Sequence, residues 1–290
     1  MMRRSVRDWR VGRPTTRQLW RLLAVLLAVQ SLLLSLATQT IETFINACLV
    51  WVFALLVMNG EGCLPRRLYP TPLGCVVGSA LIVAVLCRSP SLVSGDKIRY
   101  VLPLISGVGL ALLARPWRHI SRFAPVLMIL ALLPPMRLIT LRAPVEHLSD
   151  VTAAFAEILL ILCGLPTQRS GQVLVIPGGA ISVVGPCSGV AIMVQLVAVS
   201  LIFLMVFPMR YRWQNFVMMA VAPLLGFLIN GLRIAMLAVI MASTYPGKQW
   251  WFEFFHHHWG SQVFTGVGML LFVVVYARWQ GRQVAELMEP

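Results

Sequence analysis

The segment FVMMAVAPLLGFLINGLRIAMLAVIMAS, residues 216–243, decides the fold class of this chain. It is longer than the roughly 20 apolar residues that a helix needs to cross a bilayer, and its one charged residue is Arg233. Further apolar windows of similar character lie at about 20–38, 41–59, 72–88, 98–114, 123–141, 189–207 and 262–279. The sequence therefore predicts an all-α fold, a polytopic transmembrane helix bundle of about eight spans.

The composition supports a membrane protein. Of the 290 residues, 59% are hydrophobic and 12% are charged, whereas about 25% of the residues in a soluble domain are charged. The formal net charge is +14, but the basic residues are scattered between the apolar windows, as in loops that flank membrane spans. We therefore expect one integral membrane domain over residues 1–290, with membrane lipid around it and no nucleic acid partner. The sequence indicates no oligomeric state.

The distribution of Lys and Arg predicts the orientation. If the N-terminus is cytoplasmic, most of the 24 basic residues fall on the cytoplasmic side, as the positive-inside rule requires. We therefore expect a basic cytoplasmic tail at 1–21, N-terminal spans within 22–141 and both termini inside the plasma membrane. The connection at about 142–188 and the loop at 244–261 then share the extracytoplasmic face.

The long connection contains two short patterns. Residues 153–165 are apolar but too few to span, which predicts an interfacial or re-entrant helix that ends at Gly164. The β-branched residues of 173–184 surround a Pro-Gly-Gly sequence and predict a short hairpin. Such a hairpin would deliver Cys187 to the membrane surface.

Cys187 is the first candidate for chemistry. Pro186 before it and Gly189 after it suit a sharp entry into a helix, with Cys187 in the first turn. Unpaired N–H groups and the partial positive charge at a helix start favour a thiolate and lower the pKa of a cysteine. This location predicts a nucleophilic thiol; the alternative is a cysteine that only packs.

Arg233 is the second candidate. A guanidinium within an apolar span is costly, so it predicts a function. It could stabilise a developing oxyanion or hold a substrate carbonyl, and Asn230, one turn earlier on the same face, could orient it. The alternative is an arginine that fixes helix packing through backbone carbonyl groups.

The third candidate lies in the aromatic stretch before the last window, which contains His256, His257 and His258. Adjacent side chains diverge on a helix or strand, so three consecutive histidines do not predict a metal site. No C-x-x-C sequence occurs either, and we expect no metal and no cofactor. One imidazole beside Cys187 would suit proton transfer, but the spacing does not choose among the three.

These residues together resemble a known family. The blocks Gly185–Gly189 and Asn230–Arg233, followed by His256 four residues before Gly260-Ser261, are similar to the signature blocks of the exosortase/archaeosortase family. The stretch 252–264 is most similar to the cyanobacterial-type exosortases. The resemblance covers about residues 100–280.

The resemblance implies a polytopic, transpeptidase-like cysteine enzyme with its catalytic region within 142–280 and its site at the extracytoplasmic face. Its substrates would be proteins with a C-terminal sorting signal, which consists of a short motif such as Pro-Glu-Pro, a transmembrane helix and a basic tail. By the same resemblance Cys187 would be the nucleophile, Arg233 the polarising cation and His256 the acid/base group. We also expect supporting roles for Ser188, Gly189, Asn230, His257 and His258, although His257 and His258 depart from the small residues that usually follow the family histidine.

Two other functions are consistent with parts of the sequence. In a transporter or channel Arg233 would bind an anionic substrate, but that function predicts inverted repeats and polar residues in several spans. The chain has no internal repeat and one clearly intramembrane charge. A non-catalytic membrane assembly factor would instead tolerate Ser or Ala in place of Cys187.

Overall fold

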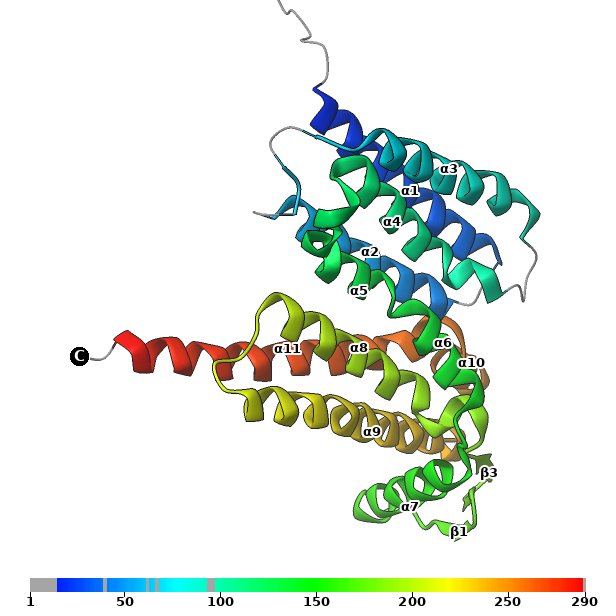
Figure 1. The fold of residues 1–290 in the computed structure, drawn as a ribbon. Coiled ribbons are helices and arrows are strands. Elements are labelled where there is room, and N and C mark those ends of the chain that lie inside the picture. Colours follow the sequence, from blue (N-terminus) through cyan, green and yellow to red (C-terminus); the bar gives the residue numbers. More distant parts are fainter. Residues whose placement is uncertain (1–14, 39–40, 61–62, 66–67, 93–96, 289–290) are drawn as a thin grey trace, which may run out of the picture.

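The computed structural model describes residues 15–38, 41–60, 63–65, 68–92 and 97–288. Most of the predicted basic tail at 1–21 therefore lies outside the described residues. Within the described part the chain is mostly helical and forms two groups of helices joined through α6, Leu133–Arg142 (Figure 1).

The first group is an N-terminal bundle. Its α-helices are α1 (Thr16–Thr38), α2 (Ile41–Asn59), α3 (Pro72–Arg88), α4 (Leu102–Ala114) and α5 (Ala124–Leu130). Short 3₁₀ turns connect them at η1 (Ser89–Ser91), η2 (Lys97–Tyr100) and η3 (Trp117–Phe123). Its core contains the buried rings of Trp20, Trp51 and Phe123. The indole N–H of Trp20 donates to the Leu110 carbonyl at 2.9 Å, so this bundle holds a buried polar atom satisfied across two helices.

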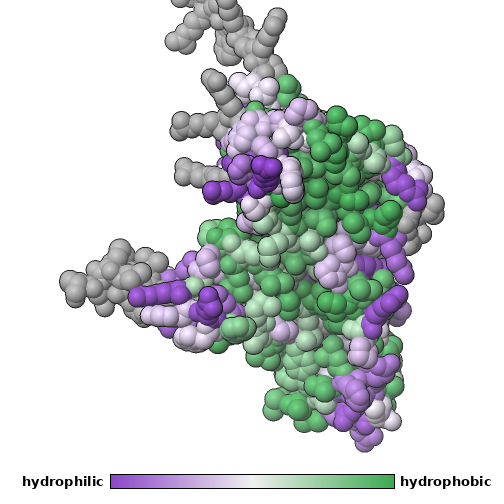
Figure 2. All heavy atoms as spheres, in the orientation of Figure 1, coloured by the Kyte–Doolittle hydropathy of each residue, from purple (hydrophilic) through white to green (hydrophobic). Residues whose placement is uncertain are grey.

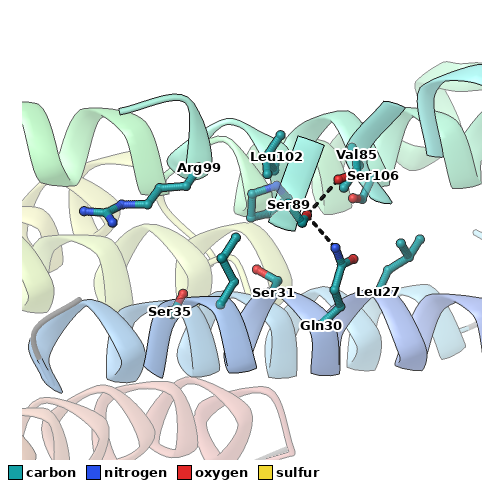
Figure 3. Close-up of a pocket in the computed structure, with 11 residues that line it drawn as sticks. Leu27, Gln30, Ser31, Ser35, Val85, Ser89, Arg99, Leu102 and Ser106 are labelled. Atoms are coloured by element: carbon teal, nitrogen blue, oxygen red, sulfur yellow. Dashed lines mark hydrogen bonds between the residues drawn. The ribbon is translucent and has the colours of Figure 1, made fainter. Parts of the chain in front are cut away.

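A polar contact also joins α1 to the end of α3. The Gln30 amide donates to the hydroxyl of Ser89, which in turn donates to the Val85 carbonyl at 2.7 Å (Figure 3). Arg99 belongs to the same small pocket, but its guanidinium points away from this pair. Because a polar group in an apolar environment needs a partner, the pair fixes the register of α1 against α3.

The second group carries the candidate residues. It consists of α7 (Glu146–Leu162), β1 (Gln168–Ser170), β2 (Val173–Ile176), β3 (Gly179–Ser182), η4 (Gly185–Ser188), α8 (Val190–Val206), α9 (Arg212–Ala242), α10 (Lys248–His256) and α11 (His258–Met288). Helices α8, α9 and α11 pack together, and α7 packs against α9 near the small sheet (Figure 1). The end of α11 lies at one end of this group, and η4 and α10 lie at the other.

The described residues include six helices long and apolar enough to cross a membrane. They are Thr16–Ala37, Ile41–Asn59, Pro72–Ser91, Trp117–Arg142, Arg212–Ala242 and Trp259–Arg282. Apolar residues cover the middle of the visible face, and hydrophilic residues gather at its two sides (Figure 2). Leu270, for example, is 63% exposed on α11. This pattern fits a surface surrounded by lipid.

The other two predicted windows form the shorter apolar helices α4 and α8. The structure thus confirms a mostly helical, membrane-embedded protein, and a total of eight spans stays a prediction. Helix α7 starts earlier than the apolar pattern at 153–165, and its predicted re-entrant placement also stays a prediction.

The predicted hairpin is present. Strands β2 and β3 pair antiparallel, with Ile176 opposite Gly179, and Gly178 has a positive φ of 86° in the turn between them. The pattern did not predict β1, which pairs with the other side of β2. The Arg169 guanidinium, on β1, pairs with the Glu157 carboxylate of α7 at 3.3 Å, so the sheet is attached to α7 before the chain reaches Cys187.

Candidate active site

The sequence predicted Cys187 in the first turn of a long helix, but the residue lies in the turn η4. The reason is Gly189, whose φ of +90° separates η4 from α8. A left-handed residue cannot continue a right-handed helix, so α8 begins only at Val190. The thiol is nevertheless buried, because Cys187 is 3% exposed and packs in the core shared by α7, the sheet and α9.

Replacing Gly189 with alanine is expected to destabilise the protein. The positive φ disfavours any side chain there, and a Cβ atom at this position would lie 2.6 Å from Nδ2 of Asn230. We expect a loss of roughly 2 kcal/mol or more, measured as a lower Tm of the protein purified in detergent.

The matched control is Gly266→Ala. That glycine lies in α11, and a Cβ atom there meets nothing within 4 Å, so alanine should preserve or raise the Tm. Equal Tm values for the two variants would contradict the structural role of Gly189.

Asn230 connects the cysteine turn to the arginine. It is fully buried on α9, and its Nδ2 donates to the Cys187 carbonyl at 2.9 Å. Its Oδ1 accepts from Nη1 of Arg233 at 3.4 Å. The predicted supporting role of Asn230 therefore has a geometric basis, because one amide contacts both candidate residues.

Arg233 is buried on the same helix, at 3% exposure. Its Nε donates to the Phe255 carbonyl at 3.2 Å and its Nη2 donates to the His256 carbonyl at 2.7 Å. These contacts are those of an arginine that fixes helix packing through backbone carbonyl groups, because the guanidinium holds the end of α10 in place. The same side chain also lines a cavity together with His256, so its positive charge lies next to that cavity as well.

His256 faces the thiol. Its Nε2 lies 3.1 Å from Sγ of Cys187, and its ring stacks on Phe252 with centroids 5.1 Å apart. On the opposite edge of the ring, Nδ1 lies 2.8 Å from Nε2 of His257. His258 begins α11, and its side chain lies outside the described part of the structure.

The electrostatics differ from those expected at a helix start. Burial raises the pKa of the Cys187 thiol, and the nearby Arg233 charge opposes this only in part. Burial also lowers the pKa of His256, as do the positive charges of His257 and Arg233, while Glu253 raises it. The predicted lowering of the thiol pKa is therefore wrong. Both shifts favour a neutral thiol beside a neutral imidazole.

Helix α7 holds η4 from the other side. Thr152 is fully buried, and its hydroxyl donates to the Ser188 carbonyl at 3.1 Å. Ser188 is also fully buried, and its hydroxyl accepts from the Val190 N–H at 3.4 Å, at the start of α8. The sequence analysis missed Thr152, which lies directly before the apolar pattern at 153–165 and has no sequence signal that marks it.

A cavity of about 410 Å³ lies beside these groups. Arg233 and His256 form part of its wall, and polar side chains from other spans line it as well, namely Glu42, Arg137, Gln195, Gln262 and Thr265. The sequence analysis assigned none of these five to the site. Gln195 stands within an otherwise apolar window, and such an isolated amide was the signal that could have indicated it.

Comparison with known families identifies the chain. The family model of the transmembrane exosortase (Exosortase_EpsH) matches residues 38–273, which include the cysteine turn, the arginine helix and the histidine segment. The chain belongs to the transmembrane exosortase family. No curated protein and no solved structure matches this exosortase. The family match and the apolar helices agree that the exosortase is membrane-embedded.

Proposed function

We propose that this exosortase is a cysteine protease and transpeptidase that acts on proteins with a C-terminal sorting signal such as a Pro-Glu-Pro motif followed by a transmembrane helix. The observation that carries the proposal is the 3.1 Å contact between Sγ of Cys187 and Nε2 of His256. These residues are 69 positions apart in the chain, and a thiol within reach of an imidazole base is the arrangement that nucleophilic catalysis needs. The similarity to cyanobacterial-type exosortases is part of this proposal.

Because the pKa shifts favour a neutral Cys187 thiol beside a neutral His256 imidazole, the reaction begins with a proton transfer between these two groups. His256 Nε2 takes the thiol proton as Sγ attacks the scissile carbonyl carbon, so the nucleophile forms during the attack. The tetrahedral intermediate carries its negative charge on the former carbonyl oxygen. His256 then returns the proton to the leaving amine as the C–N bond breaks. The acyl group remains on Cys187 as a thioester until water or an amine acceptor takes it.

Arg233 has two roles in this mechanism. Its contacts with the carbonyl groups of Phe255 and His256 hold the imidazole against the thiol. Its charge, next to the cavity, stabilises the oxyanion by an electrostatic effect that is large where water is excluded. Asn230 supports both roles because it bonds the guanidinium and the Cys187 carbonyl.

The proposed orientation places both termini in the cytoplasm and the site at the extracytoplasmic face of the plasma membrane, in a bundle of about eight spans. The arrangement of the helices supports it. The start of α1 and the end of α11 point toward one side of the molecule, and α10 and β3 lie toward the other (Figure 1). A substrate helix in the bilayer would then present its scissile bond at the level of Cys187, and the membrane itself would supply part of the orientation.

The test is co-expression with a reporter protein that ends in such a sorting signal. Membranes that contain the wild-type exosortase should convert the reporter to a shorter form that has lost its transmembrane tail. A reporter that stays intact with abundant wild-type exosortase, for a panel of signal sequences, would contradict the proposal. Proteoliposomes with the purified protein would show whether any partner is needed.

His257 should act as a positioning residue for His256. For Nε2 of His256 to accept the thiol proton, Nδ1 must carry a proton, and that N–H can donate to Nε2 of His257 at 2.8 Å. We expect His257→Phe to lower the rate about tenfold, whereas His257→Asn, which retains an acceptor, should recover part of it.

The pH profile distinguishes this role from a purely structural one. When His257 is protonated it cannot accept from Nδ1, and its positive charge then lowers the pKa of His256, so removal of this side chain should raise that pKa. The acid limb of kcat/KM, which reports the neutral base, should then move to higher pH in His257→Phe. An unchanged acid limb together with an unchanged rate would refute the assignment.

A further inference from the structure

The cavity lined by Arg233 and His256 is also lined by two glutamine side chains, each with a buried atom that is not hydrogen-bonded within the described residues. Gln195 on α8 is 1% exposed, and its Nε2 has no hydrogen-bond partner among the residues that the structure describes. The Oε1 of Gln262, on α11, is buried and is likewise without a partner in the described part of the chain. Both side chains line the cavity that Arg233 and His256 line. Unpaired buried polar atoms are costly and rare in folded proteins, which indicates that a ligand satisfies them.

The two unpaired atoms have opposite hydrogen-bonding character. Nε2 of Gln195 is a donor and Oε1 of Gln262 is an acceptor. A peptide unit offers one carbonyl acceptor and one N–H donor, so the pair matches a peptide backbone. The match is kept when both amides are turned over, because each glutamine side chain carries both a donor and an acceptor.

The cavity wall favours a polar ligand. Glu42 and Arg137 bring one charge of each sign to the wall. The third charge, that of Arg233, is the one that the proposed mechanism directs at the oxyanion. An apolar lipid chain would leave the glutamine groups unsatisfied. A stretch of polypeptide backbone satisfies them whatever its side chains.

We propose that Gln195 and Gln262 bind the backbone of the substrate next to the scissile bond and hold it in an extended form against Cys187. This inference rests on the proposed function, and it identifies the two glutamines as a substrate-binding subsite of the proposed enzyme. Because His256 and Arg233 share the cavity wall, a peptide held by the glutamines enters the site beside the reacting atoms. Recognition through the backbone also leaves the residues around the scissile bond free to vary.

The test uses purified exosortase in proteoliposomes, with the sorting-signal reporter at a series of concentrations. In Gln195→Leu and Gln262→Leu the KM should rise about tenfold each, as expected for one lost hydrogen bond to a buried partner. The Tm should stay the same or rise, because a side chain without a partner contributes little to folding and leucine suits an apolar span. Alkylation of Cys187 by iodoacetamide should stay at the wild-type rate.

The matched control is Ser200→Ala, farther along α8. Ser200 is fully buried, and its hydroxyl donates to the Met218 carbonyl at 3.3 Å. Its loss should lower the Tm and leave the KM unchanged, the opposite of the result for Gln195. A second measurement is photo-cross-linking of the reporter to the inactive Cys187→Ala variant, whose yield should fall when Gln195 is replaced.

The outcomes separate this inference from the proposed function. If wild-type exosortase cleaves the reporter, and both glutamine variants keep its KM and its cross-linking yield, the inference is overturned and the proposed function stands. Normal cleavage with impaired transfer to an amine would place the acyl acceptor in the cavity and would also overturn it. If Cys187→Ala still cleaves the reporter, the proposed function fails, and this inference fails with it.

Discussion

Replacing Cys187 with alanine is expected to lower cleavage of the sorting-signal reporter by more than about a thousandfold. The thiol lies within reach of His256 Nε2 and can form a covalent acyl intermediate, whereas an alanine side chain has no nucleophilic atom. The measurement is the fraction of shortened reporter in membranes over time, normalised to the amount of exosortase. Folding should change little, because the sulfur contributes one small group to the core around α9.

The control for this experiment is Cys163→Ala. Cys163 is an exposed free cysteine at the end of α7, so its loss should affect neither cleavage nor Tm. Hydroxylamine, which cleaves thioesters, should release an acyl fragment from the wild-type protein and not from Cys187→Ala. Undiminished cleavage in the presence of Cys187→Ala would contradict the proposed enzyme. It would favour the alternative function of a non-catalytic membrane assembly factor, which does not need the thiol.

The second large effect is expected for Arg233→Lys, at about a hundredfold loss of cleavage. The guanidinium makes three separate contacts, with the carbonyl groups of Phe255 and His256 and with Asn230. An ammonium keeps the charge but is a compact group that cannot match the planar fork. The imidazole would therefore lose its fixed position against Cys187, although the local charge remains.

Comparison with Arg233→Gln separates position from charge. The Arg233 charge lowers the pKa of the buried Cys187 thiol, so its removal should raise that pKa further and move the alkylation profile to higher pH. Arg233→Lys should leave the profile close to wild type while cleavage is impaired. Arg169→Lys is the matched control, because Arg169 pairs with Glu157 away from the thiol and should tolerate lysine. Full activity of Arg233→Lys would argue against both proposed roles.

Several features of the fold could be predicted from single stretches of sequence. The apolar windows predicted the helices, because an apolar segment long enough to cross a bilayer must satisfy its backbone hydrogen bonds internally. The Pro-Gly-Gly turn gave the β2–β3 hairpin, which depends on local backbone preferences. The third strand was missed because β1 is short and fully exposed, without an alternating pattern.

The candidate site was predicted as a set of residue types but not as a geometry. The buried arginine, the cysteine turn and the histidine run stood out because each is costly or unusual in an apolar chain. Their spacing could not choose among three adjacent histidines, and it placed Cys187 at a helix start that Gly189 in fact delays. The polar wall formed by Gln195 and Gln262 was not predicted, because each is a single amide in a different apolar helix.

The sequence by itself determined that this protein is embedded in a membrane. It also determined which residues are energetically costly in an apolar chain, namely Cys187, Arg233 and the three histidines. Those properties depend on composition and on local apolar length. Only the tertiary structure decided that Nε2 of His256 faces the sulfur of Cys187, that Arg233 holds the histidine backbone and that the thiol is buried, which raises its pKa. These properties arise where α7, α9, α10 and η4 pack together, and contacts between segments so far apart in the chain leave no periodic signal in the sequence.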